Sequence, residues 1–195
     1  MTKIRVFEGV LSREECNRLI GEYSGRLTRA MFWTNGERVF DPNIRDAFNF
    51  KWDDPALTAL SCDLATRLSD EVIAVERCEP MEIISYPPGN GSERHLDGPH
   101  RSHSIVCFLN EGYAGGELVF DDGTKFSGMP AGSAVVWENG PDAWHGCAPI
   151  VSGFKWVIVS WIRFADRIET EAEVHARIKR EAEARAAAQE TAAGD

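Results

Sequence analysis

The pattern of apolar and polar positions changes character twice along the chain. Between about residues 80 and 164, short apolar runs are separated by turn-forming Gly, Pro, Asn and Asp, which is typical of many short strands. These runs read MEIISY, SIVCFLN, GELVF, SAVVWEN and WVIVSWIRF. Their number and spacing predict a mostly β fold, either a sandwich or a jelly roll.

The segment before residue 75 has a mixed and partly helical pattern. Ser12 followed by Glu15 is typical of a capping box, in which the hydroxyl and the carboxylate each satisfy an orphan backbone donor. Apolar residues near helical spacing follow this pair. A second helix is expected to begin near Asp54 and Pro55, since proline is favoured in the first helical turn. We therefore expect helices flanking the β core.

The stretch MFWTNGERVFDPNIRDAFNFKW between these two helices is rich in turn signals. Its Asn-Gly and Asp-Pro pairs predict a loop-rich connection. Such a loop is able to fold over the barrel mouth as a lid and present aromatic side chains to a substrate. The alternative, which we favour, is that the aromatic residues pack a helix against the barrel. These residues are Phe32, Trp33, Phe40 and Phe48.

From Asp166 onward the chain is charged and rich in Ala, Glu and Arg, with few large apolar residues. This composition predicts a solvated helix that frays before the end of the chain. No internal repeat indicates a second domain. We expect one domain over residues 1–165, with a jelly-roll core at about 80–164, followed by a charged C-terminal helix or tail over 166–195.

Length and charge restrict the classes of function. A chain of 195 residues with 43% hydrophobic residues has the usual size and composition of one globular domain. Its formal net charge of -10 argues against a sequence-independent nucleic-acid binder, which carries a basic face, and against docking on an anionic membrane. We expect neither nucleic acid nor a membrane as a partner.

The cysteines and the N-terminus bear on the compartment. The five cysteines are odd in number and include no Cys-x-x-Cys pair, so we expect neither a disulfide framework nor a structural zinc site. The N-terminal segment lacks the apolar core of a signal peptide, and no apolar run approaches the roughly 20 residues that span a bilayer. These features predict a soluble protein of a reducing cytoplasm.

A His-x-Asp pair, His95 and Asp97, follows a glycine-rich turn in the stretch SYPPGNGSERHLDG. In an extended segment the side chains at i and i+2 point to the same face, so both are able to bind one metal ion. The pair alone is also typical of a polar loop with two solvated side chains. His145 precedes the last apolar strand, which a jelly roll can bring beside the pair. Two histidines and one carboxylate form the facial triad of non-haem Fe(II) oxygenases. The remaining histidines, for which we expect surface or core positions, are His100, His103 and His175.

Lys155 leads the last apolar strand, in SGFKWVIVSWIRF. A lysine in this position either extends its ammonium outward to solvent or is buried and paired with an anion. Strand alternation places Lys155, Val157, Val159 and Trp161 on one face. If this face lines the barrel, the buried ammonium is suited to one carboxylate of a dicarboxylate cosubstrate, whose 2-oxo acid end chelates iron.

These residues together resemble the 2-oxoglutarate/Fe(II) dioxygenases, and in particular the prolyl 4-hydroxylase-like branch. In that family Tyr-x-x-Gly precedes His-x-Asp, a Gly-Gly-Glu hairpin follows, and a distal His lies ten residues before a Lys. The resemblance covers about residues 80–163 and extends weakly to VLSREEC. The positions that carry it, besides the metal pair, are Tyr86, Gly89, Gly115, Gly116, Glu117, Pro130, Gly132, Trp137, His145 and Lys155.

The resemblance implies a double-stranded β-helix (jelly-roll) core and a role for each matching residue. It implies that His95, Asp97 and His145 bind Fe(II) and that Lys155 binds the 5-carboxylate of 2-oxoglutarate. It further implies O2 as a co-reactant and ascorbate as an additional candidate, since relatives commonly use it to restore oxidised iron. No side chain is then needed as a general base, and no catalytic residue is expected beyond the iron ligands. The expected neighbours of the cosubstrate are Tyr86, Ser104 and Trp161.

Several positions depart from the family pattern or have an open role. Ser92 stands where the family often has an aromatic residue, and Phe108 replaces a frequent tyrosine. Asp97 favours hydroxylation, because related iron halogenases have Gly or Ala there. Arg163 is a further candidate for the pocket or an exposed salt-bridging arginine. Arg45 resembles a common arginine of the family with no derived role.

The resemblance implies hydroxylation of an unactivated C–H, with release of succinate and CO2. Fold-level analogy favours a prolyl residue in a peptide or protein, and a free amino acid or natural-product intermediate is the alternative. A non-catalytic cupin-like barrel that binds metal or ligand is another, although it leaves Lys155 at its family spacing without a purpose. A zinc hydrolase using the same ligands is a further alternative, but it would need a general base that the sequence does not identify. A pure interaction module would depend on the C-terminal helix, whose apolar stripe is thin.

Overall fold

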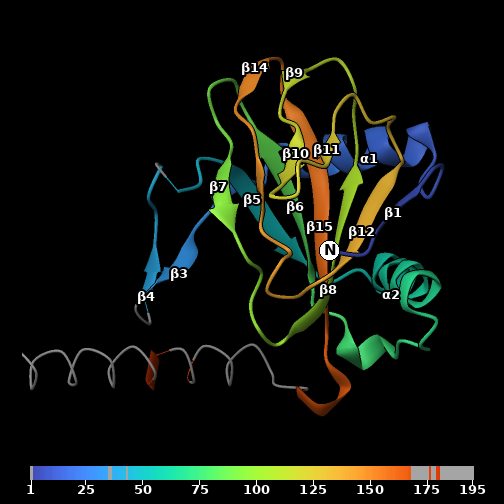
Figure 1. Ribbon diagram of the computed structural model, residues 1–195. Coiled ribbons are helices and arrows are strands. Elements are labelled where there is room, and N and C mark those ends of the chain that lie inside the picture. Colours follow the sequence, from blue (N-terminus) through green and yellow to red (C-terminus); the bar gives the residue numbers. More distant parts are fainter. Residues whose placement is uncertain (1, 35–36, 43, 168–175, 177–178, 181–195) are drawn as a thin grey trace, which may run out of the picture.

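The computed structural model describes residues 2–34, 37–42, 44–167, 176 and 179–180 (Figure 1). Antiparallel strands dominate the described chain and form the double-stranded β-helix expected from the sequence. The larger sheet has the strand order β1-β12-β8-β15-β6-β5-β2. In that order, the strands are Ile4–Phe7, Ala134–Glu138, Arg101–Phe108, Lys155–Arg163, Met81–Tyr86, Phe48–Trp52 and Thr28–Arg29.

A smaller sheet with the order β11-β10-β13-β7 lies against one face of the larger one. Its strands are β11 (Lys125–Phe126), β10 (Leu118–Phe120), β13 (His145–Cys147) and β7 (Ser92–His95). Two short ladders pair β14 (Ile150–Ser152) with β9 (Ala114–Gly115), and β3 (Phe32–Thr34) with β4 (Glu37–Val39). The five apolar runs of the sequence correspond to β6, β8, β10, β12 and β15, so the predicted strands are confirmed.

Strand alternation divides the buried apolar residues between two cores. On the outer face of the large sheet, Ile83, Ile105 and Ile158 pack with residues of the two α-helices. On the inner face, Ile84 and Val106 pack with the apolar residues of β10. The outer core attaches the helices, and the inner core encloses the space between the two sheets. This division explains why neighbouring residues of one strand serve different purposes.

Both helices begin where their capping residues predict. α1 (Arg13–Tyr23) has the complete capping box: the Glu15 backbone N–H donates to Ser12 Oγ at 3.2 Å, and the Ser12 backbone N–H donates to the Glu15 carboxylate at 2.7 Å. α2 (Pro55–Ser69) is capped by Asp54, which accepts from the first two free backbone N–H groups. A short 3₁₀ helix, η1 (Val75–Arg77), follows α2.

Gly132 fixes the N-terminal segment against the start of β12. Its φ of +84° is the left-handed conformation that favours glycine, and a Cβ there would lie 1.9 Å from the carbonyl oxygen of Leu11. In return, the backbone N–H groups of Val10 and Leu11 both donate to the Gly132 carbonyl, at 2.8 and 3.2 Å. This close approach gives a physical reason for glycine at this position.

The stretch between the helices is more ordered than predicted, and the expectation of a loop-rich connection was wrong where β3, β4 and β5 form. β5 pairs with β6 in the large sheet, with Phe50 opposite Ile83 and Trp52 opposite Met81. The alternation of aromatic and polar residues in FNFKW is a strand pattern that the neighbouring turn signals obscure. The sequence therefore contained the strand, but its short length concealed it.

The aromatic packing in this stretch also differs from the prediction. The rings of Phe50 and Trp52 lie 5.4 and 4.6 Å from the ring of Tyr23 on α1, so these two residues join helix and sheet. The predicted residues Phe40 and Phe48 instead lie around the guanidinium of Arg29, at 5.0 and 4.8 Å. The side chains of Phe32 and Trp33 fall outside the described part of the structure.

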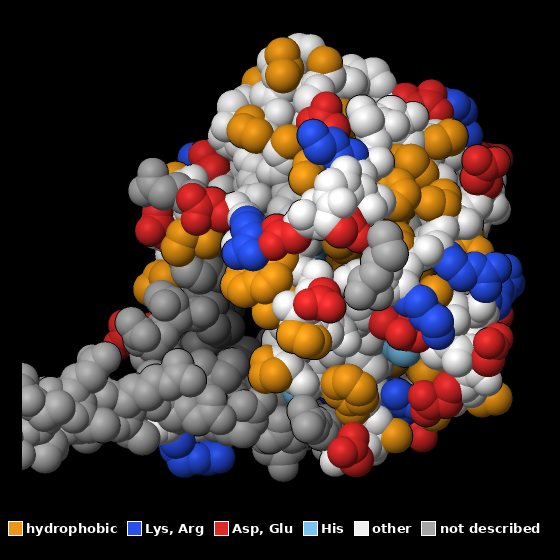
Figure 2. Space-filling view, viewed as in Figure 1, with side chains coloured by type: hydrophobic (Ala, Val, Ile, Leu, Met, Phe, Trp, Pro, Cys, Tyr) orange, Lys and Arg blue, Asp and Glu red, His pale blue; other side chains and the backbone are white. Residues whose placement is uncertain are grey.

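After β15 the chain forms a short 3₁₀ helix, η2 (Ala165–Arg167). The predicted charged helix over 166–195, including His175, lies almost entirely outside the described residues. Within the described chain, no helix has the length and apolar character needed to cross a membrane. On the face seen in Figure 2, acidic and basic side chains are interspersed among apolar ones, so this face carries no broad surface of a single charge.

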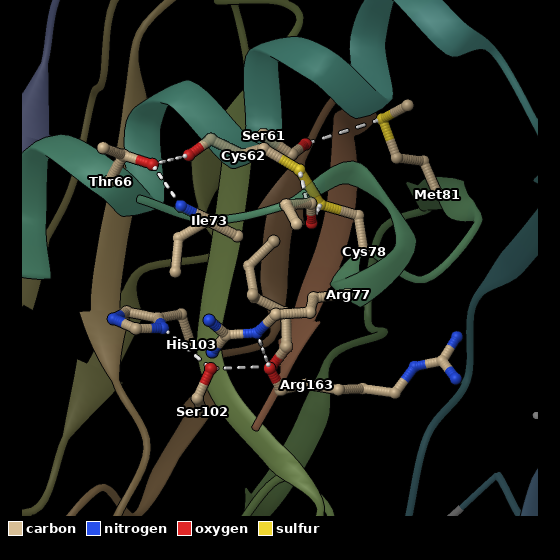
Figure 3. Close-up of a disulfide and its surroundings, with 12 residues drawn as sticks. Ser61, Cys62, Thr66, Ile73, Arg77, Cys78, Met81, Ser102, His103 and Arg163 are labelled. Atoms are coloured by element: carbon tan, nitrogen blue, oxygen red, sulfur yellow. Dashed lines mark hydrogen bonds between the residues drawn. A yellow bond between two sulfur atoms is a disulfide. The ribbon is translucent and has the colours of Figure 1, made fainter. Parts of the chain in front are cut away.

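A disulfide joins Cys62 of α2 to Cys78 just after η1, which corrects the expectation drawn from the cysteine count (Figure 3). The fold brings their Cα atoms to 6.7 Å although they are 16 residues apart in sequence. Thr66 supports the same segment, since its hydroxyl donates to the Cys62 carbonyl and accepts from the Ile73 backbone N–H. An odd count and the absence of Cys-x-x-Cys do not reveal such a pair, because tertiary packing creates the proximity.

Replacing both Cys62 and Cys78 with serine is expected to lower the free energy of unfolding by about 3 kcal/mol. A crosslink that closes a loop of about 15 residues reduces the entropy of the unfolded chain by roughly that amount. Urea unfolding without reductant, followed by tryptophan fluorescence, measures the difference. Reductant should bring the wild type to the stability of the double variant and leave the variant unchanged. A wild type that is insensitive to reductant would contradict the prediction.

Candidate metal centre

Two histidines face each other across neighbouring strands of the small sheet. His95 ends β7 and pairs in register with His145, which begins β13. Asp97 lies two residues beyond His95, just past the end of the strand. One ligand atom from each of the three side chains lies within 4.8 Å of the others. The fold thus brings together the three residues that the sequence singled out, although His145 is far from the others along the chain.

Hydrogen bonds to the backbone determine which nitrogen of each imidazole faces the cluster. Nδ1 of His95 lies 2.7 Å from the Glu93 carbonyl, and Nδ1 of His145 lies 2.9 Å from the Ala143 carbonyl. A carbonyl only accepts, so Nδ1 carries the proton in both rings and Nε2 of the neutral ring has its lone pair free. Burial and the nearby His145 lower the pKa of His95, which favours this neutral form.

Asp97 is the anionic member of the cluster and is almost fully buried. Burial acts to raise the pKa of Asp97, but His145, Arg101 and the hydrogen bond from the Ser104 hydroxyl outweigh it and hold the pKa below its usual range. Its Oδ2 lies 3.7 Å from Nε2 of His145, and its Oδ1 lies 3.7 Å from Nη1 of Arg101. Asp97 is therefore ionised at neutral pH.

The donor set fits a divalent transition metal. Two neutral imidazole nitrogens and one carboxylate offer three ligands, and this composition is the one used by non-haem Fe(II) sites that keep open positions. The cluster borders a cavity of about 450 Å³ that is lined by residues of both sheets and open to solvent. A co-reactant held in this cavity is placed beside the cluster.

Lys155 closes another part of the same cavity and is 2% exposed. Its ammonium donates to the Gly116 carbonyl at 2.8 Å and lies 3.4 Å from Sγ of Cys147. The ring centroids of Phe108 and Tyr86 are 5.3 and 5.9 Å away. Among the described residues no carboxylate lies within 4.0 Å of it, so a buried positive charge faces neutral groups only. Such a charge is costly without an anion, which makes the cavity suited to an anionic ligand.

The structure gives physical reasons for the Gly-Gly pair before Glu117. Gly115 and Gly116 have φ values of +76° and +69°, which favour glycine. A Cβ on Gly116 would lie 2.3 Å from Ile150 and 3.2 Å from Cδ of Lys155. The missing side chain therefore leaves the room that the buried lysine occupies, and the Gly116 carbonyl accepts from its ammonium.

The predicted neighbours of the cosubstrate have different positions. Tyr86 pairs in register with Lys155 and lines the cavity, and burial raises the pKa of Tyr86 to about 12, so its hydroxyl stays protonated. Trp161 also lines the cavity, on the same strand face as Lys155, as alternation predicts. Ser104 is fully buried behind Asp97, does not belong to the cavity wall, and donates to the Asp97 carboxylate.

A buried ionic network beside the cluster escaped the sequence prediction. Glu79 pairs with Arg101 through two hydrogen bonds of 2.9 and 2.7 Å and lies 3.3 Å from Nε2 of His100. Arg163, for which the exposed alternative is wrong, is largely buried with Nε 3.9 Å from Glu79. The Arg101 guanidinium lies 3.8 Å from the ring of Trp161. Residues from separate parts of the chain make this network, so no local sequence pattern predicts it.

Arg45 also has a defined place in the structure. It lines the cavity, and its guanidinium lies 3.7 Å from the Glu82 carboxylate. Glu82 and Tyr86 raise the pKa of Arg45 although burial acts in the opposite direction. An arginine in this environment stays charged.

Fold and site together define a jelly-roll protein with a His-Asp-His cluster suited to a metal ion and a buried lysine in the adjoining cavity. Residues 81–163 match the model of the 2OG-Fe(II) oxygenase superfamily. The match includes His95, Asp97, His145 and Lys155, and the superfamily that the model describes uses Fe(II) and 2-oxoglutarate.

A curated protein of similar sequence agrees with this match. The chain is 27% identical to probable prolyl 4-hydroxylase 7 of Arabidopsis thaliana, in a match that covers 82% of this chain and 62% of that protein. It therefore spans less than two thirds of the length of that relative.

Two solved structures share the fold. A viral collagen prolyl hydroxylase from Paramecium Bursaria Chlorella virus-1 has a TM-score of 0.66 at 19% identity, over 83% of this chain and 96% of that one. A prolyl hydroxylase from Trichoplax adhaerens was solved in complex with a hypoxia inducible factor oxygen degradation domain peptide fragment. It has a TM-score of 0.70 at 17% identity, over 85% of this chain and 86% of that one.

The Glu79→Gln variant is expected to lose about 3 kcal/mol of stability at pH 7, because it removes the buried anion that Arg101 contacts through two hydrogen bonds. Burial acts to raise the pKa of Glu79, but His100 and Arg101 outweigh it and hold that pKa well below its usual value. The carboxylate therefore stabilises the fold above about pH 4.5, and this contribution falls by about 1.4 kcal/mol per pH unit below that value.

Urea unfolding of wild type and variant at several pH values between 3 and 7 measures this gap. Glu22→Gln is the matched control, since Glu22 pairs with Arg18 on the exposed face of α1 and should contribute less than about 1 kcal/mol. A gap for Glu79→Gln that does not narrow in acid would contradict the assignment.

Proposed function

We propose that this protein is a 2-oxoglutarate- and Fe(II)-dependent dioxygenase that hydroxylates a prolyl residue in a peptide or protein. The observation that carries the proposal is the buried Lys155, which has no carboxylate partner in the described chain and shares one cavity with the His-Asp-His cluster. A dicarboxylate that binds metal with one end and a cation with the other fits both features.

Each residue of the cluster has a defined task in this proposal. His95 and His145 hold the iron through Nε2, because their Nδ1–H groups are engaged by backbone carbonyls. Asp97 supplies the negative charge that a divalent cation requires. The bound iron supplies the oxidising chemistry, in which O2 and 2-oxoglutarate are consumed while succinate, CO2 and an alcohol are produced.

The cavity wall orients the cosubstrate. Lys155 pairs with its 5-carboxylate, and the protonated Tyr86 hydroxyl is available as a second donor. Trp161 forms the apolar wall and keeps water out. The use of ascorbate and the cytoplasmic location stay predictions.

The substrate is proposed from the relatives. The curated relative is named a probable prolyl 4-hydroxylase, and the fold neighbour from Trichoplax adhaerens was solved with a peptide fragment. Met31 and Ile44 at the cavity edge are partly exposed apolar residues that suit a prolyl side chain entering from solvent. A free amino acid or natural-product intermediate is the alternative that a substrate screen separates.

The proposal predicts that the Fe(II)-loaded wild type converts 2-oxoglutarate to succinate in step with hydroxylation of a proline-containing peptide. His145→Ala should lose at least about 100-fold of this turnover, because it removes a ligand of the iron. Succinate release and the mass of the peptide are measured in parallel.

His103→Asn is the matched control for this test, since His103 is a buried histidine outside the cavity wall. Full turnover by His145→Ala would overturn the proposed metal centre. Succinate release that is coupled to a free amino acid instead of a peptide would replace the proposed substrate and keep the chemistry.

Lys155→Ala is expected to raise the apparent KM for 2-oxoglutarate about 30-fold or more. Truncating one partner of a buried charge pair costs at least about 2 kcal/mol. The affinity for Mn(II), used as a redox-stable substitute for Fe(II), should change less than about two-fold, and Lys125→Ala on the exposed β11 should change neither value. Equal effects on metal and cosubstrate would show that Lys155 has a different role.

A further inference from the structure

The side of Asp97 that faces the large sheet is held by a short chain of hydrogen bonds. The Ser104 hydroxyl donates to Oδ2 of Asp97, and the side-chain amide of Asn139 donates to the Ser104 oxygen at 2.9 Å. The side-chain oxygen Oδ1 of Asn139 is 3.2 Å from the same hydroxyl and competes with Asp97 as an acceptor for its proton. A hydroxyl has one proton, and the anionic carboxylate is the stronger acceptor, so the chain runs from amide to hydroxyl to carboxylate.

The backbone holds both donors in place. Ser104 lies on β8, the strand between β12 and β15, and pairs in register with Trp137 on one side and Trp161 on the other. Asn139 follows β12, where its backbone N–H donates to the Ser102 carbonyl at 2.8 Å. Ser104 is 0% exposed, so bulk solvent does not reach its hydroxyl, whose hydrogen-bond partners in the described chain are the side chains of Asp97 and Asn139. The donor is therefore pre-positioned before any ligand binds.

The carboxylate needs this support because its own segment is not in a strand. β7 ends at His95, and Asp97 lies beyond the last strand pair with His145. Oδ2, the oxygen that Ser104 holds, is also the one 3.7 Å from Nε2 of His145. A hydrogen bond to this oxygen fixes the direction in which the carboxylate points relative to the two imidazoles.

We propose that Ser104 and Asn139 are positioning residues for the iron ligand Asp97, and that Ser104 acts on the metal rather than on the cosubstrate. This inference rests on the proposed function, since it takes Asp97 as a ligand. Outer donors of this kind typically change metal affinity by about 10- to 100-fold. The assignment explains a buried serine and a half-buried asparagine that do not belong to the cavity wall.

The test is an anaerobic titration with Mn(II) alone, read by the signal of free Mn(II) in electron paramagnetic resonance. Ser104→Ala should weaken Mn(II) binding about 10- to 100-fold, and Asn139→Ala should weaken it by a smaller factor. Ser104→Thr keeps the hydroxyl and should restore most of the affinity. Ser160→Ala is the matched control, because Ser160 is also 0% exposed on the adjacent β15 and its hydroxyl has no hydrogen-bond partner among the described residues.

The outcomes separate the inference from the proposed function. A wild type that binds no Mn(II) would overturn the metal centre itself. Tight binding by the wild type and equally tight binding by Ser104→Ala would overturn only the positioning role. A raised KM for 2-oxoglutarate with unchanged Mn(II) affinity would also overturn it and would assign Ser104 to the cosubstrate. If Ser104→Ala fails to fold, as judged by its thermal unfolding without metal, Asn139→Ala decides in its place.

Discussion

The pairing of β15 with β6 on one side and β8 on the other is the constraint on which the site depends. This strand carries Lys155 at one end and Arg163 at the other, and every second residue between them lines the cavity. A register shift of one residue would turn Lys155 toward the outer core, where the α-helices pack. The ladder on both sides prevents that shift. The hydrogen-bonded sheet therefore determines where the buried charge points, and the cavity follows from it.

Buried charge is the second organising principle of the site. Glu79, Arg101 and Arg163 satisfy one another, and Arg45 lies beside Glu82, so the protein itself compensates these groups. Lys155 is compensated only by neutral groups of the described chain. The difference is informative, because a fold that pairs its other buried ions and leaves one ammonium with neutral neighbours is arranged for an anion from solution.

Much of the site could be predicted from the sequence, because its key residues lie at short and recognisable spacings. His95 and Asp97 are two apart, and His145 precedes Lys155 by ten, so motif and strand alternation were sufficient. Glu79 and Arg101 are 22 residues apart and meet only after β6, β8 and β15 have assembled, so no local signal exists for them. The disulfide between Cys62 and Cys78 was missed for the same reason. β5 was missed because turn signals on its N-terminal side outweighed five residues of alternation.

Asp97 is the point at which these separate arrangements meet. On one side it accepts from Ser104, which the central strand β8 holds, and on the other it lies 3.7 Å from Arg101, which Glu79 holds. The carboxylate is thus placed between a neutral donor fixed by the sheet and a cation fixed by the ionic network. Either neighbour alone would hold only one oxygen of this carboxylate, whose residue lies outside any strand. The two together restrict the carboxylate from both sides, so the proposed iron ligand, which lies outside any strand, is held by residues that are not themselves proposed as ligands.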